Sequence, residues 1–274
     1  MAESLQNRGK VSRQVTEKLI QSFFFIMSLI SIVIVALIFL FLFREGMPIL
    51  ETVSLTDFLF GELWYPTDDP ADFGIWPMIV GSVVVTAMAS FFAIPIGILS
   101  AVYVSEIAKH KVKEIIKPVI ELLASIPSVV IGFFGMVVMA PFLQDYFDIP
   151  VGLNVFNASI MLALMAVPTI SSISEDALNA VPRALREASY ALGANRWETI
   201  IRVVIPAGLS GISTAVILGM ARAIGETMVV LMVAGGAAAV PESIFDSCRP
   251  LPASIAAEMA EAPYRSDHYY ALFA

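Results

Sequence analysis

The sequence predicts an all-α protein, a polytopic bundle of transmembrane helices. Of its 274 residues, 58% are hydrophobic and only 15% are charged, whereas a soluble globular chain carries about 25% charged residues. The charged residues are gathered into blocks, and the stretches between the blocks reach the roughly 20 residues that a helix needs to cross a bilayer. The formal net charge of −8 argues against nucleic acid as a partner, because phosphate backbones require basic patches.

Five stretches with few or no charges are predicted to be membrane spans. The first is too long for a signal-peptide core and has no cleavage site after it, so we expect it to remain as an anchor. The only charged residues within these five stretches, Arg222 and Glu226, lie in the fifth. Pro95, Pro127 and Pro168 lie inside spans and predict kinks or broken helices. The five predicted spans are residues 19–43, 76–105, 122–144, 151–174 and 203–240.

The charged blocks between the spans predict the orientation. Placing the N-terminus in the cytoplasm leaves twelve Lys and Arg inside and three outside, as expected when basic residues are retained on the cytoplasmic side. We therefore expect a multi-pass membrane protein with a cytoplasmic N-terminus and a core over residues 76–274. The predicted cytoplasmic parts are the N-terminal tail 1–18 and the loops 106–121 and 175–202; the predicted periplasmic parts are the loop 44–75, the link 145–148 and the segment 241–268.

The last residues of the sequence are aromatic and apolar. Residues 269–274 look like the opening turn of a sixth span cut short; the alternative is a short aromatic tail.

The chain has few side chains that bind metals. The single cysteine, Cys248, excludes a disulfide framework. The two histidines, His110 and His268, are far apart in charged loops, so we expect no metal centre and no cofactor on this chain.

The loop 175–202 is predicted to form two short helices. Pro182 suits the start of the first helix, and Ala184, Ala188 and Ala191 give that helix a face of small residues. Gly193 is typical of a helix end. The second helix is expected to begin at Asn195, with Glu198 completing a capping box. One interpretation of this loop is an amphipathic hairpin that lies on the membrane surface.

Another interpretation comes from a resemblance to a known family. The residues Glu187, Ala188, Ser189, Gly193 and Pro206 follow the spacing of the EAA signature of ABC importer permeases, with small or apolar replacements at three positions. The stretches 121–135, 181–187 and 221–227 resemble the phosphate-specific branch of these permeases. The runs 244–246, 249–253 and 255–259 are similar to the PstC type rather than the PstA type. The resemblance covers roughly residues 19–274.

The resemblance implies a type-1 ABC importer permease of the bacterial inner membrane with six spans, five of them present here. The hairpin around Glu187 would couple to a cytoplasmic ATPase. The implied partners are a PstA-type permease, a PstB-type ATPase dimer and a PstS-type phosphate-binding protein. The chain has no phosphate-binding loop of the G-x-x-x-x-G-K-[ST] type, so ATP and Mg²⁺ are assigned to the ATPase, and this subunit is not expected to be an enzyme. The alternatives are a sulfate or molybdate permease or, from another class, a membrane-embedded enzyme.

Two sets of polar residues are candidates for the translocation pathway. Arg222 and Glu226 are four residues apart and are expected on one face of the fifth span. A mid-membrane Arg costs about 2.5–3.5 kcal/mol on insertion scales, so it needs a partner or a wet cavity. The pair either contacts the transported oxyanion or only tethers helices. Ser82, Thr86 and Ser90 form a hydroxyl stripe that either lines the path or bonds back to its own helix; the flanking pair Ser125 and Ser128 leaves the same two alternatives open.

Overall fold

The computed structural model describes residues 2–274, with side chains from Glu17 onward. The side chains of most of the predicted N-terminal tail, and therefore most of its charges, lie outside the described residues. The chain forms two compact units. One consists of Leu55–Ala262; the other combines Met1–Ser54 with Pro263–Ala274.

The unit Met1–Ser54 with Pro263–Ala274 contains three helices, α1 (Ala2–Gly46), α2 (Ile49–Thr52) and α15 (Asp267–Phe273). The described apolar side chains of α1 are exposed, which suits a helix in contact with lipid. At its C-terminal end, α1 packs against α15 through the edge-on rings of Phe41 and Phe273, whose centroids are 5.7 Å apart. Thr52 Oγ1 donates to Asp267 Oδ1 at 3.3 Å. The segment 269–274 thus packs as a short helix within this unit.

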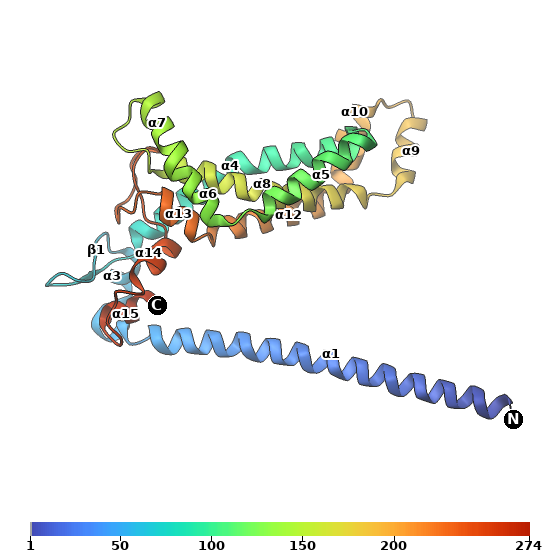
Figure 1. The fold of residues 1–274 in the computed structure, drawn as a ribbon, viewed down its shortest axis with the longest axis horizontal. Helices are drawn as coiled ribbons and strands as arrows, with labels where there is room; N and C mark the ends of the chain where they lie inside the picture. Colours follow the sequence, from blue (N-terminus) through green and yellow to red (C-terminus); the bar gives the residue numbers. More distant parts are fainter. Residues whose placement is uncertain (1) are drawn as a thin grey trace. The chain divides into compact units, whose positions relative to one another are not determined.

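The unit Leu55–Ala262 is a helical bundle with a small β-hairpin (Figure 1). Three of its segments, labelled η, are π-helical. In chain order the elements are α3 (Leu55–Phe60), β1 (Trp64–Tyr65), β2 (Asp72–Phe73), α4 (Trp76–Val102), η1 (Tyr103–Ile107), α5 (His110–Ser125), α6 (Ser128–Phe134), η2 (Gly135–Met139), α7 (Ala140–Phe147), α8 (Val155–Asn179), α9 (Arg183–Ala191), α10 (Arg196–Thr199), η3 (Ile200–Val204), α11 (Ile205–Ala207), α12 (Leu209–Ile224), α13 (Met228–Val233) and α14 (Leu251–Glu258).

Within the described residues, four helical stretches are long and apolar enough to cross a membrane, and a bent pair of helices raises the number to five. The bent pair, Arg196–Ala207 with Leu209–Ile224, turns by 69°. The other four candidates are Glu17–Thr52, Trp76–Ile107, Ser128–Phe147 and Val155–Asn179. An all-α membrane bundle, as the composition predicts, is confirmed.

Beyond shifts of a few residues at helix ends, two predicted spans are interrupted in the structure. Residues 122–125 belong to α5, and the next helix begins at Ser128, because Pro127 interrupts the chain between α5 and α6. The stretch 203–240 is not one helix: it is bent near Gly208, broken after Ile224 and no longer helical beyond Val233. By contrast, α4 and α8 are assigned as continuous helices that contain Pro95 and Pro168.

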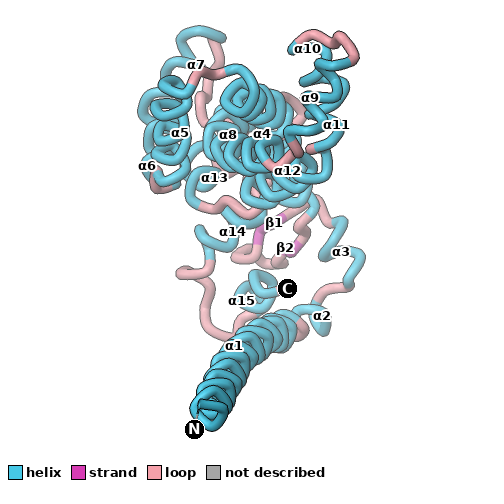
Figure 2. Tube along the Cα trace, turned by 90° about the vertical axis from the view of Figure 1, so that its right-hand side faces the viewer, coloured by secondary structure: helices cyan, strands magenta, loops and turns pink. Residues whose placement is uncertain are grey.

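The helices α4, α8 and α12 form the centre of the bundle and lie close together (Figure 2). Ile170 of α8 is 1% exposed and lies between Gly97 of α4 and Gly219 of α12. Because these glycines carry no side chain, both neighbouring helices approach α8 closely, as is usual in membrane bundles. The apolar core continues towards the β-hairpin end around Met161 and towards the α9 end around Leu178.

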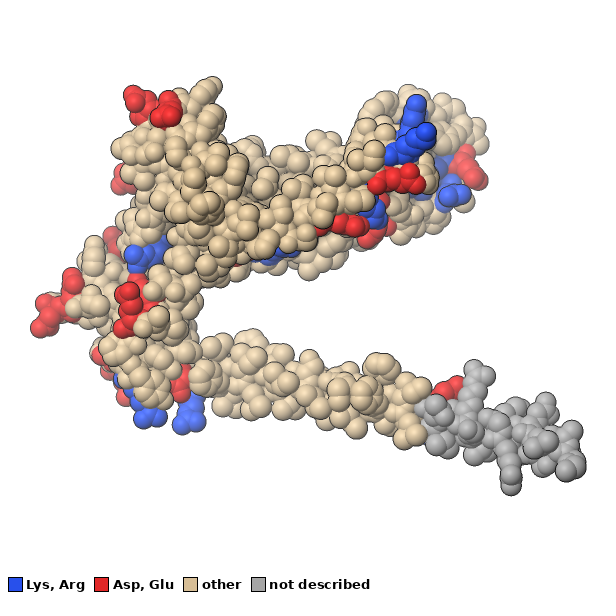
Figure 3. Space-filling view, in the orientation of Figure 1, with Lys and Arg blue, Asp and Glu red and all other residues tan. Residues whose placement is uncertain are grey.

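Charged side chains divide between the two ends of this bundle (Figure 3). Acidic side chains project at the β-hairpin end and at α7, which carries Asp145 and is followed by Asp148. Most basic side chains gather at the opposite end, on α5, α9 and α10, where Lys113, Arg186 and Arg196 lie among acidic side chains. The bias of basic residues towards this end follows the charge blocks of the sequence.

Candidate functional site

The segment 183–199 folds into a helix, a sharp turn and a second helix. Ala194 N donates to Ser189 O at 3.2 Å, and Gly193 N donates to Tyr190 O at 3.0 Å, which together form a Schellman motif at the end of α9. Gly193 has φ +85, a left-handed conformation that glycine adopts without steric cost. Asn195 and Glu198 form the capping box that begins α10. The predicted stop at Gly193 and the predicted cap at Asn195 are confirmed.

The candidate coupling residues lie on the surface of this α9–α10 hairpin or near it. Every residue of α9 is described, and none is buried. Glu187 and Ala188 are exposed, and Leu192, at the turn, is 90% exposed. Ser189 lies on the inner side, where its hydroxyl is 2.9 Å from Thr199 Oγ1 of α10. The fifth candidate, Pro206, is in α11, next to the bend that leads into α12.

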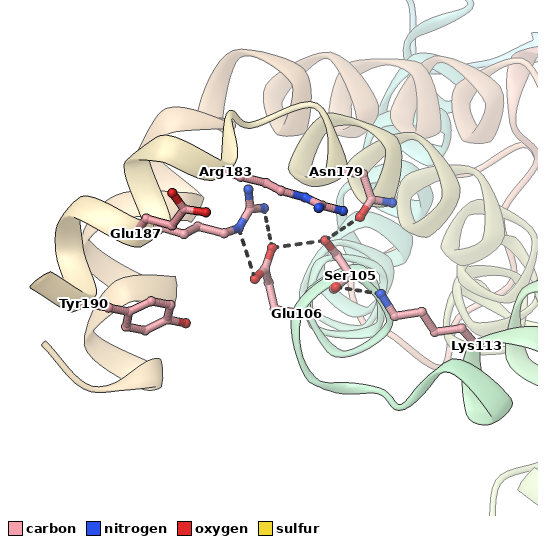
Figure 4. Close-up of a pocket in the computed structure, with 8 residues that line it drawn as sticks. Ser105, Glu106, Lys113, Asn179, Arg183, Glu187 and Tyr190 are labelled. Atoms are coloured by element: carbon pink, nitrogen blue, oxygen red, sulfur yellow. Dashed lines mark hydrogen bonds and ion pairs between the residues drawn. The ribbon is translucent and has the colours of Figure 1, made fainter.

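Behind α9 lies a cavity of about 400 Å³ (Figure 4). Glu106, at the end of η1, forms an ion pair with Arg186 of α9, with Nη2 to Oε1 at 2.6 Å. Arg186 also donates from Nη1 to Val181 O at 2.6 Å and from Nη2 to Leu178 O at 2.9 Å. The cavity is lined by Ser105, Glu106, Lys113, Asn179, Arg183, Arg186, Glu187 and Tyr190. The sequence did not indicate Glu106 as a site residue, because nothing in it shows which charged residue of the predicted loop 106–121 faces the hairpin.

The two mid-membrane charges do not pair as predicted. The helix α12 ends at Ile224, so Glu226 lies beyond the break and is no longer one helical turn from Arg222. Arg222 Nη1 donates instead to Thr169 Oγ1 of α8 at 3.4 Å, and Glu226 Oε1 accepts from Val229 N at 3.4 Å. In the described part of the chain, no ion pair joins the two side chains. Both still line one small crevice beside Leu162.

The hydroxyl stripe on α4 is buried and largely bonded within the protein. Ser82 donates to Met78 O at 2.8 Å and accepts from Leu251 N at 2.9 Å. Ser90 donates to Thr86 O at 2.7 Å. Ser82 and Thr86 line a cavity of about 10 Å³ together with Glu226, which has room for one water molecule at most. The structure therefore brings two hydroxyls of the stripe to Glu226, while Ser90 is not among the residues that line this cavity.

The second serine pair is separated from this cavity in the chain and in space. Ser125 Oγ donates to Leu122 O at 2.7 Å on an exposed surface. Ser128 begins α6, directly after Pro127. Neither residue lines the cavity that contains Glu226, so the structure does not bring this pair together with the α4 stripe.

At the opposite end of the bundle, a buried network holds the β-hairpin and the segment after α13. Trp64 of β1 is 4% exposed, and its Nε1 donates to Glu258 Oε2 at 2.9 Å. Glu258 also pairs with Arg249 at 2.5 Å, and Arg249 Nε donates to Gly236 O at 2.8 Å. This network was not predicted, because its members are far apart in the sequence.

Cys248 lies in the same region and is fully buried. Its backbone bonds to Ala234 O at 2.8 Å and to Gly236 N at 3.0 Å. Burial raises the pKa of the Cys248 thiol to about 12. In the described residues, no group of three or more His, Cys, Asp or Glu side chains could hold a metal ion.

Comparisons with known proteins agree on one class. The family described as "Binding-protein-dependent transport system inner membrane component" matches residues 93–247. The probable ABC transporter permease protein YqgH of Bacillus subtilis is 42% identical, covering 87% of this chain and 78% of that relative. The phosphate transport system permease protein PstC of Mesorhizobium japonicum is 35% identical, and the match covers 81% of this chain and 72% of that relative. The PstC of Pasteurella multocida is 32% identical, and the match covers 76% of this chain and 72% of that relative.

Two solved structures are similar in fold. The inward-facing MetNI methionine ABC transporter has a TM-score of 0.55 at 22% identity, covering 73% of this chain and 84% of the other. A bacterial ABC transporter that imports the acidic polysaccharide alginate has a TM-score of 0.54 at 14% identity, covering 72% and 71%. At these identities the likeness concerns the fold alone.

Proposed function

Because the chain belongs to the binding-protein-dependent transport system inner membrane components and has the fold of a type-1 ABC importer permease, we propose that it is the PstC-type permease subunit of an ATP-driven phosphate importer. Family membership makes it a multi-pass inner membrane protein that works with an ATPase and a substrate-binding protein. It is a non-catalytic subunit, and ATP hydrolysis belongs to the ATPase. Phosphate as the substrate is supported by the PstC relatives.

The observation that carries the coupling role is the α9–α10 hairpin. A rigid turn presents an α9 without a single buried residue, so its surface is free to dock on another protein. Small and apolar side chains, among them Ala188 and Leu192, are exposed there. Glu187 and Ala188 belong to the exposed surface of the docking helix, while Ser189 and Gly193 hold its connection to α10. Pro206 lies at the bend through which its displacement reaches α12.

The pathway role is assigned to Arg222, Glu226, Ser82, Thr86 and Ser90. Arg222 is exposed on α12, and its forked guanidinium suits a tetrahedral oxyanion. Glu226, Ser82 and Thr86 already surround one cavity. A cavity of about 10 Å³ does not admit phosphate, so passage requires α4, α8 and the α12–α13 break to separate. Ser90 lies one turn further along α4 and would extend the polar surface.

The remaining assignments concern partners and orientation. The complex would contain a PstA-type permease, a PstB-type ATPase dimer and a PstS-type binding protein, with ATP and Mg²⁺ bound by the ATPase and no cofactor on this chain. The N-terminus would lie in the cytoplasm. The gathering of basic side chains at the α9 end supports this orientation, because basic loops stay on the cytoplasmic side.

The test is ATP-dependent uptake of labelled phosphate into cells that supply the three partners, with this chain as the only PstC-type subunit. Excess sulfate or molybdate is added to parallel samples. Uptake that neither competitor reduces is the expected result. Uptake that either competitor abolishes would reassign the substrate, and uptake that persists without the chain would refute the proposal.

A further inference from the structure

We propose that Glu106 and Arg186 form a clasp that makes α9 move as one body with α4 and α8, so that breaking the clasp uncouples ATP hydrolysis from transport. The proposal rests on the proposed transport function and adds two positioning residues to it. Neither residue belongs to the EAA pattern on the docking helix.

The first step is how weakly α9 is otherwise held. None of its residues is fully buried, and Leu185 and Tyr190 remain 43% and 47% exposed, so α9 gains little apolar burial, which is the main force that fixes helices in a bundle. The chain enters α9 at Pro182 and leaves it at Gly193. The Ser189–Thr199 contact joins α9 to α10, which is the other half of the same hairpin. Polar contacts therefore supply much of what fixes α9 to the bundle.

The second step is that Arg186 supplies such contacts to two bundle helices. Its guanidinium reaches Leu178 O in the last turn of α8 and Val181 O just beyond that helix, where the negative end of the helix dipole favours a cation. The same group reaches Glu106, on the π-helical extension of α4, with Nη2 to Oε1 at 2.6 Å and Nε to Oε2 at 3.5 Å. One side chain of α9 thus binds the ends of α4 and α8.

The third step is that Glu106 receives both halves of the hairpin. Arg186 of α9 binds its carboxylate, and Arg196 of α10 donates to its main-chain oxygen. The Glu106 and Arg186 side chains are only 12% and 17% exposed. A bidentate pair that is largely removed from water is stronger and more directional than a surface ion pair.

The fourth step joins the clasp to the rest of the bundle. Ser105, next to Glu106, donates to Asn179 Oδ1 of α8 at 3.0 Å, and Lys113 of α5 donates to Ser105 O at 2.8 Å. The ends of α4, α5 and α8 therefore form one bonded platform (Figure 4). A displacement of α9 by the ATPase passes into this platform most directly through the contact of Arg186 with Glu106.

The test compares Glu106→Gln, Arg186→Gln and the double variant in the complete importer, purified through its ATPase and placed in liposomes with the binding protein. Each single variant is expected to bind the ATPase but to move at least about tenfold less phosphate per ATP, since one hydrogen bond to a charged group shifts an equilibrium by about that factor. The double variant should move no less phosphate per ATP than the more impaired of the two single variants, because both changes break the same contact. Glu114→Gln, an exposed glutamate on α5, is the control and should match the wild type.

An unchanged ratio in either assembled single variant would overturn the proposal, as would a double variant whose loss is the product of the single losses. Should the variants fail to assemble, the wild-type clasp is tested by the distance between spin labels at Leu99→Cys of α4 and Leu185→Cys of α9, two exposed positions. This distance should stay constant when ATP binds. A change of a helical turn, about 5.4 Å, would refute the clasp. The distance between the labels can be measured whatever the substrate is. A wild-type complex that hydrolyses ATP without moving phosphate would therefore refute the proposed substrate and leave the clasp to be judged from this distance.

Discussion

The packing of α8 between two glycines predicts how the bundle responds to a single added methyl group. A Cβ at Gly97 would lie 2.8 Å from Ile170 Cβ and 2.7 Å from its Cγ2. A Cβ at Gly219 would lie 2.4 Å from Ile170 Cγ1 and 2.9 Å from Cδ1. Both distances are too short for carbon atoms in contact, but the atoms differ in how easily they can move.

Gly97→Ala should be the more costly change. The Ile170 Cβ is fixed to the α8 backbone, so α4 must move away from α8, and overpacking of this kind costs about 1–3 kcal/mol. At Gly219 the obstructing atoms swing with the side-chain torsions of Ile170, so the cost should fall near 1 kcal/mol, at the lower end of that range. The gain in helix propensity from Gly to Ala, about 0.5–1 kcal/mol, applies to both variants and cancels in the comparison.

Ile170→Ala distinguishes the contact at Gly97 from the contact at Gly219. Alone it should cost about 2–5 kcal/mol through lost burial and a cavity. Combined with Gly219→Ala it removes Cγ1 and Cδ1, and the new methyl group fills part of the cavity, so the double variant should be more stable than the sum of the single effects by about 0.5–3 kcal/mol. Combined with Gly97→Ala it leaves the Cβ contact in place, and the relief should be smaller.

The assay is unfolding of the purified protein in detergent, followed by circular dichroism with increasing SDS. Gly225→Ala is the control: a Cβ there meets only Ala221 O at 3.5 Å, so its effect should stay within about 0.5 kcal/mol. The reasoning would be refuted if Gly97→Ala were as stable as the wild type, or if Ile170→Ala relieved both glycine variants equally.

Three further predictions concern the thiol, the turn and the pathway. Cys248 should resist maleimide at pH 8 in folded membranes and react after SDS denaturation, because it is buried and its raised pKa of about 12 keeps the thiol protonated below that pH; labelling of the native protein would show that the segment is open. Gly193→Val should lose about tenfold in ATPase capture, since a left-handed backbone costs such a residue about 1–2 kcal/mol, whereas Gly193→Asn should retain capture; equal behaviour of the two would contradict the role of φ +85. Arg222→Gln should insert normally and lose phosphate uptake, while Arg202→Gln, outside the cavity residues, should retain it; normal uptake by Arg222→Gln would end the pathway assignment.

Local chemistry allowed much of this fold to be predicted from the sequence. The charge-free stretches predicted the helices, because burial in lipid depends on composition over about 20 residues. The stop at Gly193 and the cap at Asn195 were predicted because both depend on a few neighbouring residues. The break after Ile224 was not, since Gly225 is tolerated inside many helices and the apolar run continues through it. The predicted Arg222–Glu226 pair failed for that reason.

The long-range contacts could not be predicted. Trp64 and Glu258 are separated by 194 residues and Glu106 and Arg186 by 80, and a single sequence contains no signal for which charges meet. The predicted topology placed Cys248 in the periplasmic segment 241–268 and gave no indication of its burial. The structure instead buries it beneath the 234–236 turn, where Gly235 and Gly236 have positive φ and return the chain to the core.

No residue of α9 is buried, so the side chains on its outer surface can change with little effect on the stability of the bundle. Its shape depends on Pro182, the Gly193 turn and the inward-facing Arg186, while Ala184, Glu187 and Ala188 contribute nothing to the core. Exchanges at these outer positions alter what the helix recognises without unfolding the bundle, since surface substitutions usually change stability by no more than about 0.5 kcal/mol. The same scaffold can therefore be re-engineered to accept a different ATPase by changing a few side chains on one short helix.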